Sequence, residues 1–463
     1  MSPANDRTSP RSRPLVVLVR PTDVETDSRA KKLGISLARL GYDVVVLGRS
    51  GTRRRREGRI GSARVTLLVP ASPLRGAPRR LVRIPVRRLR RFEKPLNVRL
   101  QRAEKWADAR LRAWDREGAY LWSAAQRDFR ATYGTELVRL LPDVVHCHDP
   151  RMLPLAFAAA GRVRQVTGRT CKVVYDAREN FAGVPPENVT LHNYHRRLLR
   201  SERTLVPRAA ALLTVSEDTA RALAERLHPS HPPTVVLNAP VAGATPVGEV
   251  RDLRRDCGIG PDVPLMVYPG AATAPRGVDT MIEALVHEPT LHAALVVVPF
   301  PHPRAQDMTS LAARLGVTDR LHLLPPVPAD HVPAYLAAAD VTVSPILRGP
   351  ANHEAALPNK LFEMLHSGRP VVTSDIRAMS AFVRDHGIGV VFRSGDAQDL
   401  ARAVREVLDD PSPYTDGERR ARLVREWSWQ AQEAPLAAAY ARAATPGPAH
   451  GGEPFPEVVV DWD

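Results

Sequence analysis

The segment from residue 357 to residue 375 carries the clearest chemical signal in the chain. It reads Leu-Pro-Asn-Lys-Leu-Phe-Glu-Met-Leu-His-Ser-Gly-Arg-Pro-Val-Val-Thr-Ser-Asp. Pro358 suits the first position of a helix, and Gly368 suits the residue that follows its last turn. The run from Pro370 to Thr373 predicts a strand that is covered on both faces. We therefore expect a short helix, a glycine stop and a buried strand.

This helix is suited to hold an anion and a sugar next to each other. Its first backbone N–H groups lack helical partners and can bind an anion, and Lys360 adds a point charge beside them. Glu363 follows one turn later, and a carboxylate can accept hydrogen bonds from two adjacent ribose hydroxyls. The alternative is a glutamate on a solvated helix face, but its neighbours on both sides are apolar. The combination favours a sugar-nucleotide site.

Length and composition limit the possible classes of protein. The chain has 463 residues, of which 44% are hydrophobic, so two or more domains are expected. Cys147, Cys171 and Cys257 form neither a disulfide framework nor a zinc-binding pattern, which favours a reducing compartment. No apolar run approaches the ~20 residues that span a bilayer, and residues 1–13 lack an apolar signal-peptide centre. We expect a cytoplasmic protein, with a peripheral position on the inner face of the membrane as an option.

The net charge of +16 is concentrated in one segment. Residues 71–130 hold 17 lysine and arginine residues against 6 acidic ones, a net charge of +11. An apolar stripe with helical spacing runs through it, formed by Ala107, Leu111, Trp114, Leu121, Trp122, Ala125 and Phe129. Two interpretations stay open: a helix packed on its own domain, or a surface at residues 75–130 that contacts an anionic membrane or acceptor. No nucleic-acid partner is expected, because no nucleic-acid motif is present.

Apolar strands alternate with helical stretches in two series along the chain. In the first series we expect strands at residues 15–19, 43–47, 65–69, 143–146, 171–175, 211–215 and 234–237. After a mixed, polar linker we expect strands at residues 265–268, 295–298, 321–324, 341–344, 371–373 and 390–392. This alternation predicts an α/β fold with two doubly wound, Rossmann-like parallel sheets. Ligands bind such sheets at the carboxyl ends of the strands.

The two series define the expected domains. Residues 14–240 form an N-terminal domain, which the basic helical insertion at 71–133 interrupts. Residues 241–412 form a C-terminal domain that begins with the linker 241–262. Residues 1–13 and the proline- and glycine-bearing tail at 446–463 are expected to be disordered.

The segment around Glu363 resembles glycosyltransferase family 4, and further matches follow in the family's order between residues 15 and 440. They are Asp27–Lys32, Gly41–Val44, Pro142–Asp149, Tyr175–Glu179, Leu213–Ser216, Asn238–Pro240, Arg276–Asp279 and Ser428–Trp429. The resemblance implies a GT-B fold, with an acceptor-side N-terminal domain and a nucleotide-sugar-binding C-terminal domain across a cleft. It also implies that residues 413–445 cross back onto the N-terminal domain.

The resemblance further implies an activity. A sugar of the hexosyl or N-acetylhexosaminyl type would move, with retention, from a nucleotide-diphosphate donor to a hydroxyl of a glycan, glycolipid or small molecule. Glu363 would hold the ribose, with Asn359 and Leu361 contacting the donor beside it. Arg276 and Lys360 would neutralise the departing diphosphate.

Residues of the N-terminal domain would complete the cleft. His148 follows a predicted strand and, by resemblance, hydrogen-bonds the donor sugar, whereas His146 lies one step deeper and is expected to be structural. Asp27, Arg29 and Glu179 are candidates for the acceptor side, with structural roles as the alternative for each.

The chain departs from the family pattern at two places. The family has a glutamate eight positions before Glu363, where this chain has Ala355, so the adjacent Glu354 is the candidate for the donor-sugar contact. An arginine expected just after Gly270 is also missing, and Arg348 is a weaker candidate for the diphosphate. No metal ion or other cofactor is expected, and the Asp-x-Asp at residues 461–463 is interpreted as a chance occurrence.

The mechanism implied is substitution on one face of the sugar, through an oxocarbenium-like transition state. A donor phosphate oxygen can take the proton, so no dedicated base is predicted. The altered first acid supports another interpretation, a non-catalytic GT-B protein that binds a glycan or a partner. A sugar-nucleotide epimerase or a phosphorylase is a third option, and the lack of an evident Schiff-base lysine setting counts against the phosphorylase.

Overall fold

The computed structural model describes residues 11–52, 54–71, 121–184, 189–244, 246, 248–349, 351–355, 357–448 and 455–462. The basic segment expected at residues 75–130 therefore lies mostly outside the described residues, as does most of the expected disordered N-terminus at 1–13. The described part of the insertion belongs to a helix over residues 121–140. Phe129 and Tyr133 of this helix are buried in the core of the N-terminal domain, so this part packs on its own domain.

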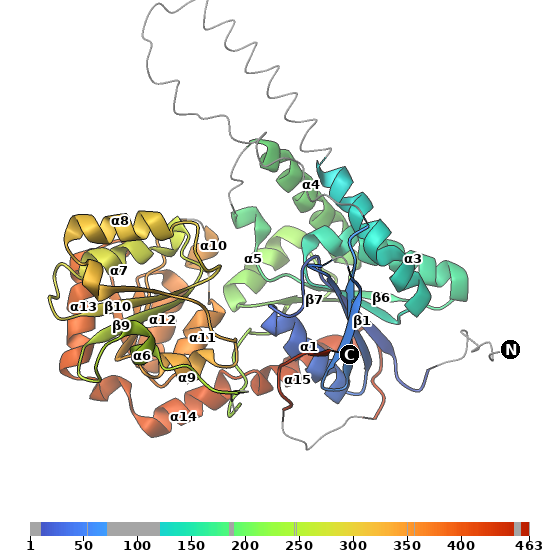
Figure 1. The fold of residues 1–463 in the computed structure, drawn as a ribbon. Helices are drawn as coiled ribbons and strands as arrows, with labels where there is room; N and C mark the ends of the chain where they lie inside the picture. Colours follow the sequence, from blue (N-terminus) through green and yellow to red (C-terminus); the bar gives the residue numbers. More distant parts are fainter. Residues whose placement is uncertain are drawn as a thin grey trace, which may run out of the picture.

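Two α/β domains lie next to each other in the molecule (Figure 1). The N-terminal domain is built on a nine-stranded sheet with the order β15-β3-β4-β2-β1-β5-β6-β7-β8. Neighbouring strands pair in parallel except around β3, which pairs antiparallel with both β4 and β15. The strands are β1 (Leu15–Val19), β2 (Asp43–Arg49), β3 (Arg56–Ile60), β4 (Ala63–Leu68), β5 (Val144–Cys147), β6 (Lys172–Asp176), β7 (Ala211–Thr214), β8 (Thr234–Val235) and β15 (Asp461–Trp462).

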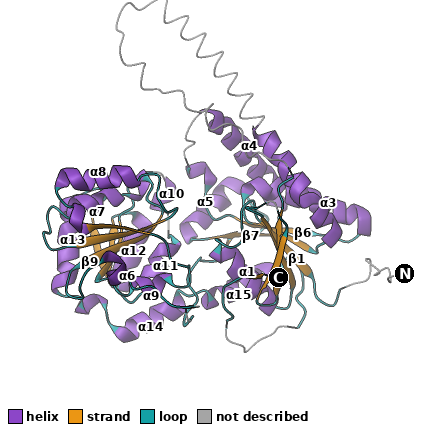
Figure 2. Ribbon diagram, in the orientation of Figure 1, coloured by secondary structure: helices purple, strands orange, loops and turns teal. Residues whose placement is uncertain are grey.

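The C-terminal domain is built on a six-stranded sheet with the order β11-β10-β9-β12-β13-β14. Every pairing in it is parallel. Helices cover both faces of the sheet (Figure 2), and its strands are therefore nearly continuous apolar runs. The strands are β9 (Leu265–Gly270), β10 (His292–Val297), β11 (Leu321–Leu324), β12 (Val341–Ser344), β13 (Val371–Ser374) and β14 (Gly389–Phe392).

The helices connect successive strands, and most of them are amphipathic in sequence. Several begin at an Asp or Ser whose side chain accepts from a free backbone N–H, as Asp27 does for α1 and Asp396 for α13. The helices are α1 (Ser28–Arg39), α3 (Leu153–Thr167), α4 (Val189–Leu205), α5 (Glu217–Leu227), α6 (Leu253–Cys257), α7 (Val278–Ala284), α8 (Ala305–Leu315), α9 (Val332–Leu336), α10 (Ala351–Glu354), α11 (Asn359–His366), α12 (Arg377–His386), α13 (Ala397–Asp409), α14 (Gly417–Glu426) and α15 (Glu433–Ala441).

The chain returns to the N-terminal domain after α14. Trp429 is fully buried in the core of that domain, and its indole N–H donates to the hydroxyl of Ser36 in α1 (2.9 Å). Leu436 and Tyr440 of α15 join the same core. The predicted α/β class with two doubly wound, Rossmann-like sheets is confirmed, and the strands expected from the sequence all correspond to observed ones.

Two elements of the N-terminal sheet were not expected. Strand β3 lies in an arginine-rich stretch that lacks the apolar alternation of a typical strand. The tail expected to be disordered at residues 446–463 is ordered where it is described, because Asp461 and Trp462 pair with β3. The indole of Trp462 lies 4.0 Å from the guanidinium of Arg56, and Gly58 leaves room for the carbonyl of Asp461. We refer to residues 455–462 as the C-terminal strap.

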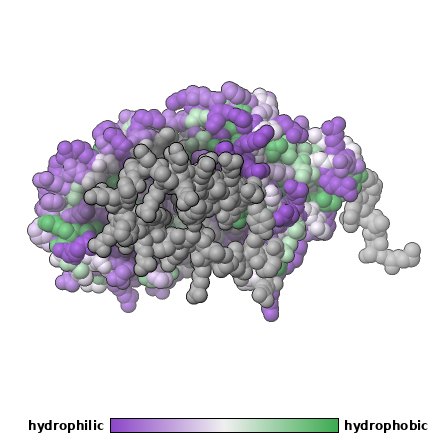
Figure 3. Space-filling view, turned by 90° about the horizontal axis from the view of Figure 1, so that it is seen from above, coloured by the Kyte–Doolittle hydropathy of each residue, from purple (hydrophilic) through white to green (hydrophobic). Residues whose placement is uncertain are grey.

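The described surface is mainly hydrophilic, with scattered apolar patches, when seen from above (Figure 3). Within the described residues, no helix combines the length and the apolar character that crossing a bilayer requires.

Candidate active site

The carboxyl ends of strands from both sheets meet at the gap between the domains. Strand β5 is followed by His148, and β9 is followed by the turn that carries Arg276. Two adjoining cavities lie in this gap. One, the His148 cavity, has a volume of about 550 Å³, and the other, the Glu363 cavity, about 530 Å³. Asn238 lines both cavities, so they adjoin at this residue.

Helix α11 contributes to the wall of both cavities. It begins at Asn359, and Pro358 is the residue before the first turn instead of the first helical residue that we expected. Asn359 lines the His148 cavity, and Glu363 lines the other cavity one turn later. The expectation for Leu361 is wrong. Its side chain is buried in the core, and its N–H donates to the carbonyl of Pro358 (2.9 Å), because the helix turns this position inward.

Lys360 is held in a polar niche beneath this helix end. Its ammonium donates to the hydroxyl of Tyr268 (2.6 Å) and lies 4.4 Å from the centre of the Tyr268 ring. Gly270 has a φ of +125°, and a Cβ there would collide with the end of the Lys360 side chain. Burial and the nearby Arg276 lower the pKa of Lys360 to about 7, against a weaker opposing effect of Glu363.

The charges of Arg276 and Lys360 lie close enough to repel each other, and Glu363 offsets this effect only in part. Among the described residues no carboxylate forms an ion pair with either side chain. Two cations so placed, next to the N–H groups at the start of α11, can attract a doubly charged group such as a diphosphate.

Glu363 is partly buried between the two domains. Burial raises the pKa of its carboxyl group, and the charges of Lys360 and Lys32 partly offset this effect. Lys32 comes from α1 of the N-terminal domain, which shows that the carboxylate faces across the gap. The pattern of flanking apolar residues indicated this inward position.

The N-terminal wall is organised around a buried ion pair. Nε and Nη2 of Arg29 donate to the two oxygens of the Asp176 carboxylate (2.7 Å for each bond), and Nη1 donates to the carbonyl of Val236 (2.6 Å). Both side chains are fully buried. The expectation that Arg29 is an acceptor-side residue is therefore wrong, because its side chain is fully buried and all three of its nitrogens donate to groups of the same domain.

Asp27 and Glu179, the other two acceptor-side candidates, differ in position. Asp27 is buried, accepts from the N–H of Ala30 at the start of α1 (3.0 Å) and pairs with Arg20 and Arg178. Arg20 and Arg178 line the His148 cavity, whereas Asp27 itself does not. Asp27 therefore affects the cavity only by positioning these two arginines. Glu179 is exposed and does line the His148 cavity.

His148 lines the cavity and is held by a hydrogen bond at only one of its two ring nitrogens. Its Nδ1 lies 3.2 Å from Asp176, and its Nε2 has no hydrogen-bond partner among the described residues. Burial and the adjacent His146 hold the pKa of His148 well below its usual value, so the ring is neutral. With the proton on Nδ1 facing the carboxylate, Nε2 can accept a hydrogen bond from a substrate hydroxyl. His146 bonds to the hydroxyl of Tyr440 inside the core, in line with its expected structural role.

The same network offers a possible arrangement for a metal ion. The ligand atoms of His146, His148 and Asp176 lie within 4.8 Å of one another. Burial opposes the charge of Asp176, but Arg29 and the two histidines outweigh it and hold the pKa of this carboxyl well below its usual value. Because the guanidinium already occupies the carboxylate and repels cations, these residues do not fit a metal site.

Glu354 and Arg348 lie outside both cavities. Glu354 accepts from the backbone N–H of Arg377 at the start of α12 (3.1 Å) and pairs with Arg348 (3.3 Å). Arg348 also pairs with Asp375 (3.4 Å). The preceding residue, His353, lines the His148 cavity instead. Neighbouring side chains on a helix point in directions roughly 100° apart, so Glu354 points away from the cavity. The donor roles expected for Glu354 and Arg348 are therefore not supported by their positions.

Several residues of the site were missed by the sequence reasoning. Tyr268, which accepts from Lys360, lies within the apolar strand β9 and gave no signal other than its polar tip. Asn238 appeared only as part of a segment that closes the first domain, yet it lines both cavities and its side-chain oxygen is buried without a partner among the described residues. Lys32 is one of only six lysines in the chain, and this rarity was an available signal.

Comparisons with known proteins agree with this arrangement. The family model described as "Glycosyl transferases group 1" matches residues 263–410, which cover most of the C-terminal domain. A D-inositol 3-phosphate glycosyltransferase of Geodermatophilus obscurus is 29% identical over 255 residues, which are 52% of this chain and 55% of the relative. A 2-deoxystreptamine glucosyltransferase of Streptomyces kanamyceticus is 28% identical over 232 residues, or 49% of this chain and 57% of the relative. The chain thus spans about half the length of the curated relatives it matches.

Solved structures match over nearly the whole chain. Sucrose-phosphate synthase from Thermosynechococcus elongatus aligns with a TM-score of 0.66 at 16% identity, over 93% of this chain and 99% of that one. HepE from Anabaena, solved in complex with UDP-glucose, aligns with a TM-score of 0.64 at 13% identity, over 92% and 99% of the two chains. At such identities the match concerns the fold alone. Residues 263–410 are thus similar to the group 1 glycosyl transferases, and the chain as a whole has the GT-B fold of these solved structures.

Proposed function

We propose that the protein is a retaining glycosyltransferase that moves a sugar from a nucleotide-diphosphate donor to an acceptor hydroxyl. One observation carries the proposal. Glu363 lies on the wall of the interdomain gap, one turn from a helix start where Lys360 and Arg276 bring two unpaired positive charges together. A carboxylate can hold a ribose and the two cations a diphosphate, which are two of the three parts of a nucleoside diphosphate.

The chemistry follows from this charge distribution. Arg276 and Lys360 stabilise the negative charge that develops on the departing diphosphate. The neutral His148 accepts a hydrogen bond through Nε2 and so positions a hydroxyl of the donor sugar. The acceptor hydroxyl attacks the face that the diphosphate leaves, and a phosphate oxygen takes its proton. Holding both reactants in this geometry adds to the rate acceleration that charge stabilisation provides.

The comparisons suggest substrate classes to test first. HepE was solved with UDP-glucose, which supports a uridine diphosphate sugar as donor. The relatives act on an inositol phosphate and on 2-deoxystreptamine, both of which are cyclitol-type acceptors. A hexose or N-acetylhexosamine donor and a hydroxylated ring acceptor are therefore our first proposal, ahead of a glycan or glycolipid.

Three further expectations remain predictions. These are that transfer needs no metal ion, that the protein is cytoplasmic, and that residues 75–130 contact an anionic membrane surface. The first is supported by the basic side chains that stand ready for the diphosphate, and the third by the net charge of +11 over residues 71–130.

The test has two stages. Calorimetric titration with UDP, ADP, GDP and TDP identifies the base, and mass spectrometry of reactions with the corresponding nucleotide sugars then detects transfer or hydrolysis. We expect binding of one nucleotide in the micromolar range and release of that nucleotide from its sugar. Nucleotide binding without any turnover would instead favour a non-catalytic GT-B protein, an alternative that Ala355 and the occupied carboxylate of Glu354 keep open. Failure to bind any of the four would overturn the proposal.

A further inference from the structure

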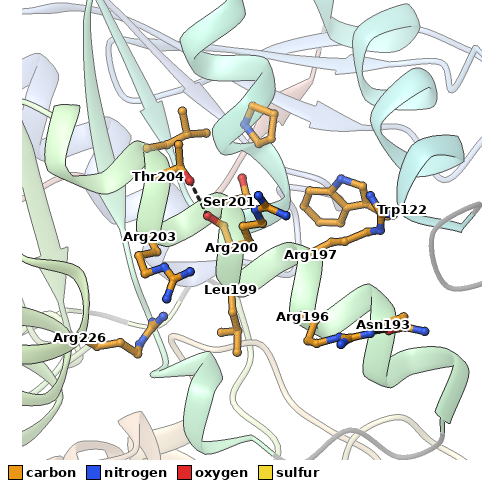
Figure 4. Close-up of a pocket in the computed structure, with 12 residues that line it drawn as sticks. Trp122, Asn193, Arg196, Arg197, Leu199, Arg200, Ser201, Arg203, Thr204 and Arg226 are labelled. Carbon is orange, nitrogen blue, oxygen red and sulfur yellow. Dashed lines mark hydrogen bonds between the residues drawn. The ribbon is translucent and has the colours of Figure 1, made fainter. Parts of the chain in front are cut away.

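A third hollow lies on the N-terminal domain, outside the interdomain gap (Figure 4). It has a volume of about 980 Å³ and lies between α4, the start of α3, α5 and the helix over residues 121–140. We call it the arginine groove. Its wall includes Arg196, Arg197, Arg200 and Arg203 of α4, together with Arg226 of α5 and Trp122.

Two of these arginines are already engaged. Arg226 pairs with the buried carboxylate of Glu202 (2.9 Å), and Arg196 donates to the side-chain oxygen of Asn193 (3.1 Å). They belong to the scaffold of the groove and do not leave their charge free for a ligand.

The other three arginines have no such partner. Arg197, Arg200 and Arg203 are exposed, and no acidic side chain among the described residues pairs with them. They are spaced three residues apart, which places them along one face of α4 where like charges repel. In the view of Figure 4 the guanidinium groups of Arg203 and Arg226 also point toward one another. Because Arg226 is already paired with Glu202, the repulsion that a bound anion would relieve is the one among Arg197, Arg200 and Arg203.

Unsatisfied polar atoms point in the same direction. The hydroxyl of Ser201, which lines the groove, is buried and has no hydrogen-bond partner among the described residues, and neither has Nε of Arg226. Buried donors without acceptors are uncommon in folded proteins. A ligand that supplies several oxygen acceptors would satisfy them.

Apolar side chains share the groove with the arginines. Pro154, Leu199 and the indole of Trp122 line it, and Trp122 is held edge-on against Tyr194 at 5.3 Å between ring centres. Guanidinium groups bind phosphates, and Trp prefers the boundary between headgroups and acyl chains. A nucleic acid would need several rings free to stack on bases, whereas this groove offers one ring that already contacts another.

We propose that the arginine groove docks the N-terminal domain on a membrane surface by binding anionic phospholipid headgroups. The docking is independent of donor chemistry, because none of its residues lines the two interdomain cavities. Helix α5 links the two regions. Thr219 lines the His148 cavity, and Arg226 lies seven residues later, about 10 Å along the helix axis. Docking would therefore bring the acceptor side of the cavity close to the bilayer.

The experiment is vesicle co-sedimentation of the full chain. One set of vesicles is pure phosphatidylcholine, and the other contains about one-third phosphatidylglycerol, an anionic lipid. The test variant is Arg197→Glu, Arg200→Glu and Arg203→Glu combined. The matched control combines Arg314→Glu, Arg384→Glu and Arg422→Glu, which are exposed arginines of the C-terminal domain with the same change in net charge.

We expect the natural chain to bind the anionic vesicles and not the neutral ones, with binding that weakens as salt is added. The test variant should lose about two orders of magnitude in partition coefficient, since each basic side chain near the surface contributes about fivefold. The control variant should lose much less. The milder variant with glutamine at the three test positions should fall between the natural chain and the glutamate variant, which guards against loss through misfolding.

Four results would overturn the proposal. The first two are equal binding of the natural chain to neutral vesicles and absence of binding to anionic ones. The other two are an equal loss of binding in both triple variants and unchanged binding in the test variant. Unchanged binding would indicate that the segment at 75–130 makes the contact instead. A single-stranded RNA that binds the natural chain more tightly than the vesicles do, and loses affinity in the test variant, would also contradict it. Nucleotide affinity is measured on the same samples, so a failure here is distinct from a failure of the glycosyltransferase assignment.

Discussion

The two walls of the interdomain gap hold their charges in opposite ways. On the N-terminal side, Arg29 and Asp176 are fully buried and satisfy each other through two hydrogen bonds. On the C-terminal side, Arg276 and Lys360 bring like charges together, and Glu363 has no partner that neutralises it fully. The first arrangement is complete without a ligand, whereas the second is favourable only when a ligand supplies the missing charges and hydroxyls.

The difference separates residues that shape the site from residues that use it. A buried, paired charge contributes to stability because breaking the pair leaves its partner desolvated. An unpaired charge in a cavity is instead poised to change its protonation or to bind an ion. Sequence position does not reveal the distinction, since Arg29 and Lys360 both lie in segments that resemble family motifs.

The largest expected effect concerns the N-terminal wall, which we call the closed side because its charges are paired within the protein. Asp176→Ala should lower the free energy of unfolding by about 3–5 kcal/mol, because it leaves Arg29 buried without a counter-charge. Urea denaturation measures this, with Asp43→Ala as the control. Asp43 pairs with Arg64 at the surface, where both side chains are 44–46% exposed, and its loss should cost roughly 0–1 kcal/mol. Equal losses in the two variants would show that the buried pair is not what stabilises this wall.

The next effect concerns the C-terminal wall, which we call the open side because its charges are not paired within the protein. Glu363→Ala should weaken the binding of UDP, or of whichever nucleotide the natural chain binds, by about 10- to 100-fold, since hydrogen bonds to a charged acceptor are lost. The fold should be unaffected, because the carboxylate faces a cavity. Glu354→Ala is the matched control and should leave affinity nearly unchanged. Calorimetry on both variants checks this, and an unchanged affinity in the Glu363 variant would remove the central assignment.

The third effect is a pH dependence that only the open side should show. Free Lys360 loses its proton as the pH rises through about 7, whereas a bound diphosphate keeps it protonated. Binding therefore takes up a proton above this pH, and nucleotide affinity should fall by up to about tenfold per pH unit. Lys360→Met should bind weakly and show a flatter profile, whereas Lys172→Met, an exposed lysine of β6, should keep the slope. A slope that persists in the Lys360 variant would assign the titration to another group.

The smallest effect concerns the C-terminal strap, which belongs to neither wall but closes the far end of the Glu363 cavity through residues 455–458. Trp462→Ala should cost about 1 kcal/mol in unfolding free energy, from the lost contact with Arg56. Val459→Ala is the control, since that side chain is 43% exposed. If the strap shapes the cavity, the Trp462 variant should also bind nucleotide more weakly, as calorimetry would detect. Identical behaviour of the two variants would mean that the strap is held by its backbone pairing alone.

Most of the fold was predictable because buried parallel strands are apolar runs in the sequence, and the segments between them have the apolar spacing of helices. The exceptions were β3 and β15, which are short, polar or lie in a proline-bearing tail, and pair only with each other and with β4. The open side of the site was also predictable, because Lys360 and Glu363 lie within one turn of a single helix. The closed side was not, because Arg29 and Asp176 are separated by 147 positions in the chain.

Local spacing along the chain was therefore enough to indicate two parallel α/β domains, a helix start suited to an anion, and a carboxylate one turn behind it. These properties depend on residues close together in sequence, where helix and strand periodicity dictates direction. Which of the motif residues are free to meet a ligand depended on partners brought together by folding. Arg29, Asp27 and Glu354 find theirs within the protein, whereas the charges around Lys360 do not, because an electrostatic partner is chosen by distance in space.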